Sequence, residues 1–294
     1  MGFFWRLLPV FLAYFSIGRI DAWGREGHFM VCKIAEKFLT ENAREAVTNL
    51  LPPVAGGDLA AVCSWADDIL TRYPWSFPLH YVNTPGVCNY DQSRDCHNDD
   101  GVQGMCVVGA INNYTTQLRT FGQPFNNLTE SLMFLAHFVG DVHDPVDVSF
   151  YDDEGGIFII VYWYGSKTNL HRVWDVNIVQ TAINKIYKNN VNAMIESIEG
   201  NITENWNGEI IQWQSCASND LTCVTEYASE SITLCCDYAY KGVKENSSLG
   251  DEYFFTRLPV VEKRIAQAGV RLAALLNNIF YRTPKKGSVN LVSG

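Results

Sequence analysis

Hydrophobic residues recur at helical spacing along most of the chain. The pattern predicts helices over residues 27–39, 132–142, 168–187 and 259–280. The third starts at a cap signal from Thr168 or Asn169, and the last has Pro259 near its expected start. Residues 157–164, IFIIVYWY, are β-branched and aromatic and predict a strand. Together these patterns indicate a mainly α protein with a short β-hairpin.

The organisation of the chain indicates one helical domain behind a leader. Residues 1–22, MGFFWRLLPVFLAYFSIGRIDA, resemble a secretory signal peptide, with Arg6, an apolar stretch from Leu7 to Ile17, and Ala22 before a plausible cleavage point. The stretch is short for a membrane span, and an uncleaved signal anchor is the alternative. Residues 23–294 contain no repeat, Gly/Ser linker or low-complexity block, so we expect a single domain whose last residues form a flexible tail.

The cysteines and the glycosylation sequons indicate the secretory pathway. All nine cysteines follow the leader, and an odd number leaves at least one unpaired or paired between chains. Four sequons start at Asn113, Asn127, Asn201 and Asn246. We therefore expect a soluble, exported glycoprotein stapled by disulfides, extracellular or vacuolar, with no membrane attachment after the leader is removed.

Composition and charge narrow the class of function. Hydrophobic residues make up 47% of the chain and charged residues 18%, which is typical of a globular protein. The formal charge is −10, and removing residues 1–22, which contain two arginines and one aspartate, makes it −11. This excludes a broad basic footprint for nucleic acid. It does not exclude an enzyme that binds phosphate through metal ions, because bound cations would neutralise some of the carboxylates.

One short stretch concentrates titratable side chains beside apolar ones. In LAHFVGDVHDPVDVSF, residues 135–150, His137 and Asp141 are four residues apart and share one face of the predicted helix. Asp147 follows Pro145, where the helix is expected to have ended. Buried acids and imidazoles are costly unless they are paired or bind a metal.

A second pair repeats the same spacing. His171 and Asp175, in NLHRVWD, are also four residues apart. Either pair alone could be a hydrogen bond on a helix surface, but two pairs together with His28 and Asp67 favour divalent metal ions held by imidazole and carboxylate groups. Cleavage after Ala22 would also leave Trp23 as the N-terminus, whose amino group and carbonyl could chelate a metal near His28.

These motifs resemble those of the S1/P1 nuclease family, in its plant secreted branch. The matching stretches, in family order, are WGREGH, CSWADDI, LHYVNTP, FLAHFVGDVHDP, DEGG, NLHRVWD and GDEYFFTRLPVVEKRIAQAGVRLAALLN. They cover nearly the whole chain after the leader. The zinc phospholipases C are related in fold, but the nuclease motifs match better. The resemblance implies a mainly helical domain of the phospholipase C/P1 nuclease type.

The resemblance also implies three zinc ions and their ligands. One set is Asp67, His80, His137 and Asp141; a second is the Trp23 amino group and carbonyl, His28 and a bridging Asp141; the third is Asp147, His171 and Asp175. Asp67 would be the catalytic residue that orients or deprotonates water. Tyr81 would stack on a base and Asn83 would contact the edge of that base, although Tyr81 could also be an ordinary core aromatic.

Other residues receive structural roles from the same resemblance. It implies four disulfides, Cys32–Cys63, Cys88–Cys236, Cys96–Cys106 and Cys216–Cys223, with Cys235 left over; spacing alone does not give this connectivity. We expect His143 to be a hydrogen-bonded structural residue and His97 a surface residue. We expect Asp144, Asp152 and Asp153 to be solvated or to cap turns.

Three departures from the family pattern leave two functions open. Asp147 stands where the family has His, Leu70 where it has Lys or Arg, and Ile157 where it has Asn. The first hypothesis is a monomeric zinc-dependent nuclease, without a stable protein partner, that acts on single-stranded DNA and RNA and on 3′-mononucleotides. The second is a catalytically impaired relative, stabilised by metal, that binds nucleic acid or another partner.

Overall fold

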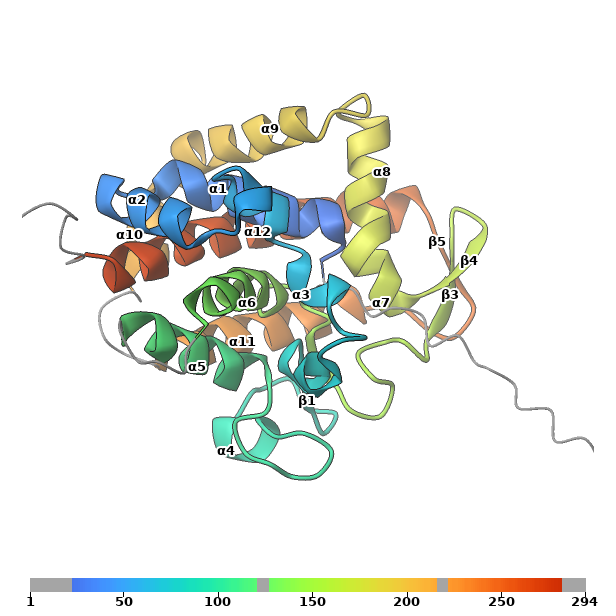
Figure 1. Ribbon diagram of the computed structural model, residues 1–294. Coiled ribbons are helices and arrows are strands. Elements are labelled where there is room, and N and C mark those ends of the chain that lie inside the picture. Colours follow the sequence, from blue (N-terminus) through green and yellow to red (C-terminus); the bar gives the residue numbers. More distant parts are fainter. Residues whose placement is uncertain (1–22, 121–126, 216–221, 282–294) are drawn as a thin grey trace, which may run out of the picture.

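The computed structural model describes residues 23–120, 127–215 and 222–281. The expected leader, Cys216 and the expected tail after residue 281 lie outside these residues. The prediction of a mainly α fold is confirmed (Figure 1). In the part of the chain that the structure describes, no helix is both long and apolar enough to cross a membrane.

Helices make up most of the described chain. The longer α-helices are α1 (Arg25–Phe38), α2 (Glu41–Leu50), α5 (Val107–Arg119), α6 (Leu128–Asp141), α8 (Ile178–Lys185), α9 (Val191–Glu204), α10 (Asn207–Ser215), α11 (Thr222–Leu234) and α12 (Asp251–Ile279). Short α-helical turns are α3 (Trp65–Asp68), α4 (Gln92–Asp95) and α7 (Leu170–Arg172). Three 3₁₀ segments, η1 (Pro53–Ala55), η2 (Leu59–Val62) and η3 (Pro74–Leu79), and two π-helical turns, η4 (Val173–Asn177) and η5 (Cys235–Ala239), complete the set.

Helix α12 forms the centre of the packing and lies beside α1 (Figure 1). Helices α5, α6 and α11 lie on one side of this pair, and α8 and α9 on the other. The close approach of α1 and α12 depends on Gly269, where a Cβ atom would lie 2.6 Å from Ile34 Cγ2. Burial of this apolar face, at roughly 25 cal/mol per Å², holds the helices together. It also places the N-terminal turn of α1 next to the end of α6.

Two small sheets join segments that are far apart in the sequence. Strand β1 (Val82–Thr84) pairs in parallel with β2 (Val148–Phe150), with Val82 opposite Val148. Strands β3 (Ile160–Trp163) and β4 (Ser166–Asn169) form the expected β-hairpin, and β5 (Ser247–Leu249) adds to β3 in parallel. The strand predicted over residues 157–164 therefore covers only Ile160–Trp163. Residues 157–159 instead follow a tight turn in which Gly155 and Gly156 have positive φ.

Two helix predictions need correction. Residues 168–187 do not form one helix: β4 ends at Asn169, whose side chain caps α7, and the π-helical turn η4 separates α7 from α8. Pro259 lies inside α12 rather than near its start. A proline there removes the backbone donor that would bond the Phe255 carbonyl. Both residues are exposed, so water can satisfy that carbonyl.

Three of the expected disulfides are present: Cys32–Cys63, Cys88–Cys236 and Cys96–Cys106. Cys235 is a buried free thiol, as expected. The fourth expected bridge involves Cys216, outside the described residues. The first bridge joins α1 to the residues just before α3, so it fixes two elements that carry site residues.

A partly buried ion-pair network, with buried arginines and a partly exposed Glu230, ties α11 and α12 to the turn after α6. Glu230 Oε2 accepts from Arg264 Nη1 at 2.7 Å and from Arg271 Nη1 at 2.6 Å. Arg264 Nε donates to the His143 carbonyl at 3.1 Å, and Arg271 Nη1 lies 2.9 Å from His143 Nε2. The expectation that His143 is a hydrogen-bonded structural residue is confirmed, with its Nδ1 also 2.7 Å from the Val139 carbonyl oxygen.

This network predicts a pH-dependent contribution to stability. Burial alone would raise the pKa of Glu230, but Arg271 and Arg264 outweigh it and lower that pKa to about 2, below its ordinary value of 4.5. The stabilisation is therefore complete above about pH 4.5 and is lost as the pH falls toward 2. We expect Glu230→Gln to lower the free energy of unfolding at pH 7, with the difference from wild type shrinking over that window. Urea unfolding with chelator present measures this; Glu45→Gln, an exposed control, should show no such pH-dependent difference.

Candidate metal centre

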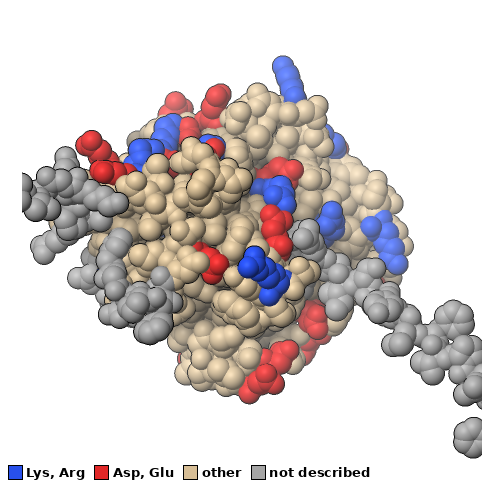
Figure 2. Space-filling model, viewed as in Figure 1, with Lys and Arg blue, Asp and Glu red and all other residues tan. Residues whose placement is uncertain are grey.

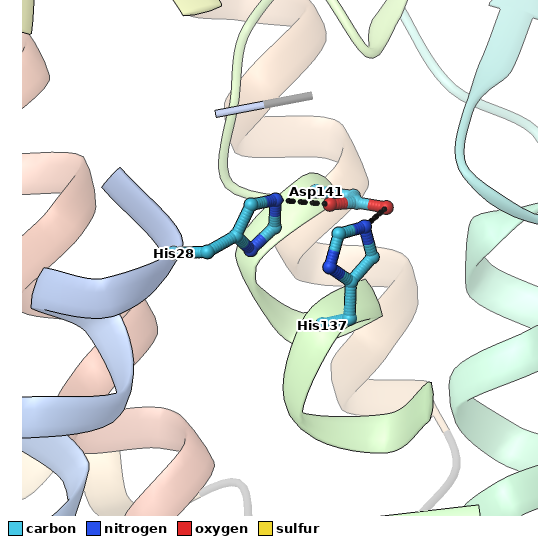
Figure 3. Close-up of side chains that lie close together, drawn as sticks. All are labelled: His28, His137 and Asp141. Carbon is cyan, nitrogen blue, oxygen red and sulfur yellow. Dashed lines mark ion pairs between the residues drawn. The ribbon is translucent and has the colours of Figure 1, made fainter. Parts of the chain in front are cut away.

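Three side chains from two helices meet at the centre of the molecule (Figure 3). His137 and Asp141 project from α6 and His28 from α1, and all three are fully buried. His28 Nε2 lies 3.2 Å from Asp141 Oδ1, and His137 Nε2 lies 3.4 Å from Asp141 Oδ2. The four-residue spacing on α6 places both of its side chains on one face, as the sequence predicted. Asp141 thus directs one oxygen toward each imidazole.

Two further residues extend the cluster on the side of α3. Asp67 belongs to α3, and His80 follows η3 directly. Asp67 Oδ1 lies 3.1 Å from His137 Nε2 and 3.5 Å from His80 Nδ1, while His80 Nδ1 lies 3.1 Å from Asp141 Oδ2. Two groups, His28/His137/Asp141 and Asp67/His80/His137, each have ligand atoms within 4.8 Å of one another. The two groups share His137 and are linked by Asp141, which touches members of both.

The third predicted set also converges, but less tightly. His171 Nε2 lies 3.3 Å from Asp175 Oδ2 and 3.8 Å from Asp147 Oδ1. Asp147 reaches this place because its carbonyl accepts from the Val82 backbone N–H at 2.8 Å, beginning the β1–β2 pairing. The same pairing keeps Asp147 near His80, which lies two residues before Val82. The structure therefore brings all the predicted side-chain ligands into one buried region.

Backbone carbonyls orient two of the imidazoles. His137 Nδ1 lies 2.8 Å from the Cys63 carbonyl oxygen, and His171 Nδ1 lies 2.9 Å from the Gly155 carbonyl oxygen. An imidazole that donates from Nδ1 presents an unprotonated Nε2, which is the form that binds a metal ion. In both residues that Nε2 faces the carboxylates. Cys63 is held by its bridge to α1, so the disulfide also supports the orientation of His137.

Burial favours the neutral form of His80 and His171 and penalises the negative charge of Asp141 and Asp147. Burial, together with His137, holds the pKa of His80 well below its ordinary range, and burial lowers the pKa of His171 to about 4. Burial raises the pKa of Asp141 well above its ordinary value, and Asp147 and Asp67 add repulsion. The pKa of Asp147 is also raised, by burial and then by Asp144 and Asp67.

These observations fit divalent cations. Both carboxylate oxygens of Asp147 are buried without a hydrogen-bond donor among the described residues. Several carboxylates buried together repel one another, and a bound cation would remove that cost while neutral imidazoles complete its coordination. Mixed nitrogen and oxygen donors are typical of zinc sites.

Trp23 begins the described chain and is fully buried. The backbone N–H of Gly24 donates to the Asp175 carbonyl at 2.7 Å, and the Gly24 carbonyl accepts from Gly27 in the first turn of α1. A Cβ atom at Gly27 would lie 2.8 Å from Trp23 Cβ. Residues 23 and 24 are therefore fixed between α1, which carries His28, and η4, which carries Asp175. Its role as a ligand stays a prediction.

A cavity of about 390 Å³ opens beside His171. Tyr81, Asn83 and Ile157 line it, and the Oδ1 atom of Asn83 is buried without a hydrogen-bond partner in the described structure. His97 is exposed, as expected, but it also lines this cavity, which the sequence did not indicate. Tyr81 is therefore available to a ligand rather than enclosed in the core.

The acidic residues outside the ligand sets lie in three different environments. Asp144, expected to be solvated or to cap a turn, is fully buried, so the solvated alternative is wrong; its Oδ1 accepts from the Val146 N–H at 3.1 Å, and burial raises its pKa to about 7. Asp153 caps a turn by accepting from the Gly156 N–H at 2.8 Å. Asp152 is exposed at the cavity.

Comparison with known proteins gives one consistent result. The profile of the S1/P1 nuclease family matches residues 23–281. "Endonuclease 2" of Arabidopsis thaliana is 48% identical over 279 residues, covering 93% of this chain and 96% of that protein. "Endonuclease 4" of the same plant is 50% identical over 271 residues, covering 90% of this chain and 91% of that protein. "Nuclease P1" of Penicillium citrinum is 30% identical over 269 residues, covering 87% and 97%.

Proposed function

Because the chain belongs to the S1/P1 nuclease family, in its plant branch, we propose that it is a zinc-dependent endonuclease. Its substrates are the phosphodiester bonds of single-stranded DNA and RNA, and it also hydrolyses 3′-mononucleotides. The observation that carries the proposal is a buried cluster of imidazoles and carboxylates directly beside a cavity with an aromatic wall. Such a cluster can hold metal ions at the place where a phosphate joins its nucleoside.

The proposed zinc ligands are those that the family resemblance implies, and the convergence of their side chains in the structure supports the proposal. They are the N-terminal amino group and carbonyl of Trp23, His28, Asp67, His80, His137, Asp141, Asp147, His171 and Asp175, arranged as three sites with Asp141 shared by two. Zinc held there would act as a Lewis acid on phosphate and lower the pKa of water.

Three further roles, in proton transfer and in binding the base, are proposed for side chains of this protein. Asp67 lies 3.1 Å from His137 and accepts a proton from the attacking water. Tyr81, at the cavity wall, stacks on a nucleobase, which is worth about 1–3 kcal/mol and tolerates any base. The Oδ1 atom of Asn83 is buried and has no hydrogen-bond partner among the described residues, so it can accept a hydrogen bond from the edge of the base. Stacking requires an unpaired base, so single strands are the substrate.

The rest of the proposal concerns the mature protein. Residues 1–22 are a signal peptide that is removed, residues 23–294 form the domain, and the product acts as a monomer outside the cell or in the vacuole. The sequon residues Asn113, Asn127 and Asn246 are exposed and Asn201 is partly exposed, so all four are accessible to glycosylation.

The second candidate is a metal-stabilised protein that binds nucleic acid with little turnover. Three positions favour it. Asp147 adds a negative charge within the third set of ligands, and Leu70 is an aliphatic side chain where the family has a cation. Ile157 gives the cavity an apolar side chain where the family has an amide. Metal content and turnover on single-stranded DNA decide between the candidates. Zinc binding with turnover supports the nuclease; zinc and DNA binding without turnover support the alternative.

Two of these positions give a direct prediction. Asp147→His combined with Leu70→Lys should raise nuclease turnover about tenfold or more, because it removes a negative charge and adds a cation near phosphate. Rates on single-stranded DNA and zinc content measure it. Unchanged turnover in a double variant that holds its zinc would contradict this electrostatic explanation. Lys37→Leu, a charge change on the exposed side of α1, is the control and should have no effect.

A further inference from the structure

The cavity beside His171 has an uneven distribution of charge. Its inner end, toward the metal centre, is formed by His171, Val146 and Gly155. Asp99, Asp152 and Glu154 also line it, and all three are exposed. Asp95 lines it too, but this carboxylate is paired with Arg94 at 2.6 Å. Among the described residues that line the cavity there is no lysine or arginine.

The turn that carries two of these carboxylates is held in place. Asp153 Oδ1 accepts from the Gly156 N–H at 2.8 Å and from the Tyr240 hydroxyl at 2.7 Å. Glu154 has a φ of +49°, a left-handed conformation that costs a non-glycine residue energy. Gly155 fits so closely that an added Cβ would lie 2.8 Å from the Val146 carbonyl oxygen. The backbone of residues 152–154 is therefore fixed against the metal centre.

Asp99 comes from the loop closed by the Cys96–Cys106 disulfide. Within this loop Gly104 donates to the Cys96 carbonyl at 2.8 Å, and Val102 donates to Asn98 Oδ1 at 2.8 Å. Acidic side chains gather at the lower end of the face in Figure 2, where Figure 1 shows the chain around α4. Two separate segments thus bring carboxylates to one cavity.

These carboxylates share the cavity with the side chain that is proposed to stack on the base, because Tyr81, Asp99, Asp152 and Glu154 all line it. Their electric field opposes the negative charge of any ligand that enters past them.

We propose that Asp99, Asp152 and Glu154 make the outer part of this cavity reject strongly anionic groups. Among mononucleotides the site therefore prefers one with a free 5′-hydroxyl over one with a terminal 5′-phosphate, which carries more charge than the single charge of each phosphodiester in a strand. This inference rests on the proposed function, which places the 3′-phosphate at the metal centre. The nucleoside then fills the cavity and directs its 5′ carbon away from His171, toward the carboxylates. A 5′-phosphate carries about −1.5 to −2 charges at pH 7 and meets the three carboxylates with no lysine or arginine among the described lining residues to offset them.

The test compares adenosine 3′-monophosphate with adenosine 3′,5′-bisphosphate, which lose the same 3′-phosphate. The zinc-loaded enzyme should show a kcat/KM about five- to twentyfold higher for the monophosphate at low ionic strength, and 0.5 M salt should reduce that ratio. The triple variant Asp99→Asn, Asp152→Asn, Glu154→Gln keeps the shapes of the side chains and removes their charge. It should bring the ratio close to that of the wild type in high salt.

A matched control removes the same charge elsewhere. Glu45→Gln, Glu196→Gln and Glu204→Gln change exposed residues of α2 and α9, and together they should leave the ratio as in the wild type. A ratio that the cavity triple variant does not change overturns the inference, while hydrolysis of either compound still supports the proposed function. If neither compound is hydrolysed, the proposed function fails, and calorimetric Kd values for both compounds test the inference instead. Equal Kd values, or no binding of either compound, overturn it.

Discussion

Asp141→Asn should remove more than one zinc ion per chain and lower nuclease turnover by more than about 100-fold. Asp141 directs one oxygen to within 3.2 Å of His28 Nε2 and the other to within 3.1 Å of His80 Nδ1. A neutral amide binds zinc poorly, so the two proposed zinc sites that use Asp141 each lose a ligand at once. Asp67, the other carboxylate of these two groups, lies near His137 and His80 on the side of α3.

The substitution should affect metal binding more than folding. The pKa of Asp141 is raised by burial and by Asp147 and Asp67, so removing this charge relieves a cost in the metal-free protein. We therefore expect metal-free Asp141→Asn to unfold at the same temperature as metal-free wild type or at a higher one. Elemental analysis gives the zinc content, and circular dichroism gives the melting temperature. Asp237→Asn, an exposed residue in η5, is the matched control and should keep full metal content.

One result would be incompatible with the proposed ligand sets. A properly folded Asp141→Asn protein that keeps its full zinc content would show that the metals are held elsewhere. Loss of a single ion would mean that Asp141 serves one site rather than two.

The helices of this protein were largely accessible to sequence reasoning, because their buried faces leave a regular pattern. The prediction over residues 132–142 matches the later part of α6, where apolar side chains and His137 share the buried surface. The prediction over residues 168–187 was wrong for a specific reason. The chain there alternates between a strand, a short helix and a π-helical turn, and the turn carries Asp175 toward His171. Average periodicity does not report such a local change.

The candidate site could be predicted only in part from the sequence. The spacing of His137 and Asp141 predicts that they share a helix face, because residues four apart are neighbours on a helix. Spacing cannot predict that Asp67, His80 and His28 join them, since these come from other elements brought together by packing. They were predicted only through the resemblance to a family, and the structure places them within 3.5 Å of a partner in the cluster.

The acidic side of the cavity was not predicted. Asp99 belongs to a cysteine-closed loop, and Asp152 and Glu154 to a turn more than fifty residues later along the chain. Solvated carboxylates in loops are common, so neither segment stands out alone. The cysteine spacing around residues 96–106 indicated a fixed loop, but the neighbours of that loop depend on the tertiary fold.

Retaining one residue before Trp23 should abolish one zinc site and lower turnover about 100-fold or more, comparable to the loss from Asp141→Asn. Trp23 is fully buried, and the Gly24 N–H donates to the Asp175 carbonyl at 2.7 Å, so these two residues have a fixed position beside α1 and η4. If the Trp23 nitrogen is a free amine, it offers a lone pair to a metal ion next to His28. A peptide nitrogen offers none, because its lone pair is delocalised into the carbonyl.

The experiment compares three forms of one protein. The first begins at Trp23, the second begins at Ala22, and the third carries a removable N-terminal extension that a protease cleaves to expose Trp23. We expect full zinc content and turnover in the first, loss in the second, and recovery in the third after cleavage, with N-terminal sequencing confirming each start. A chain beginning at Ala22 that binds as much zinc as the mature form would exclude the amino group as a ligand. Loss of metal with an unchanged melting temperature of the metal-free protein would instead assign the defect to coordination, because the extra residue adds no side-chain charge and leaves α1 intact.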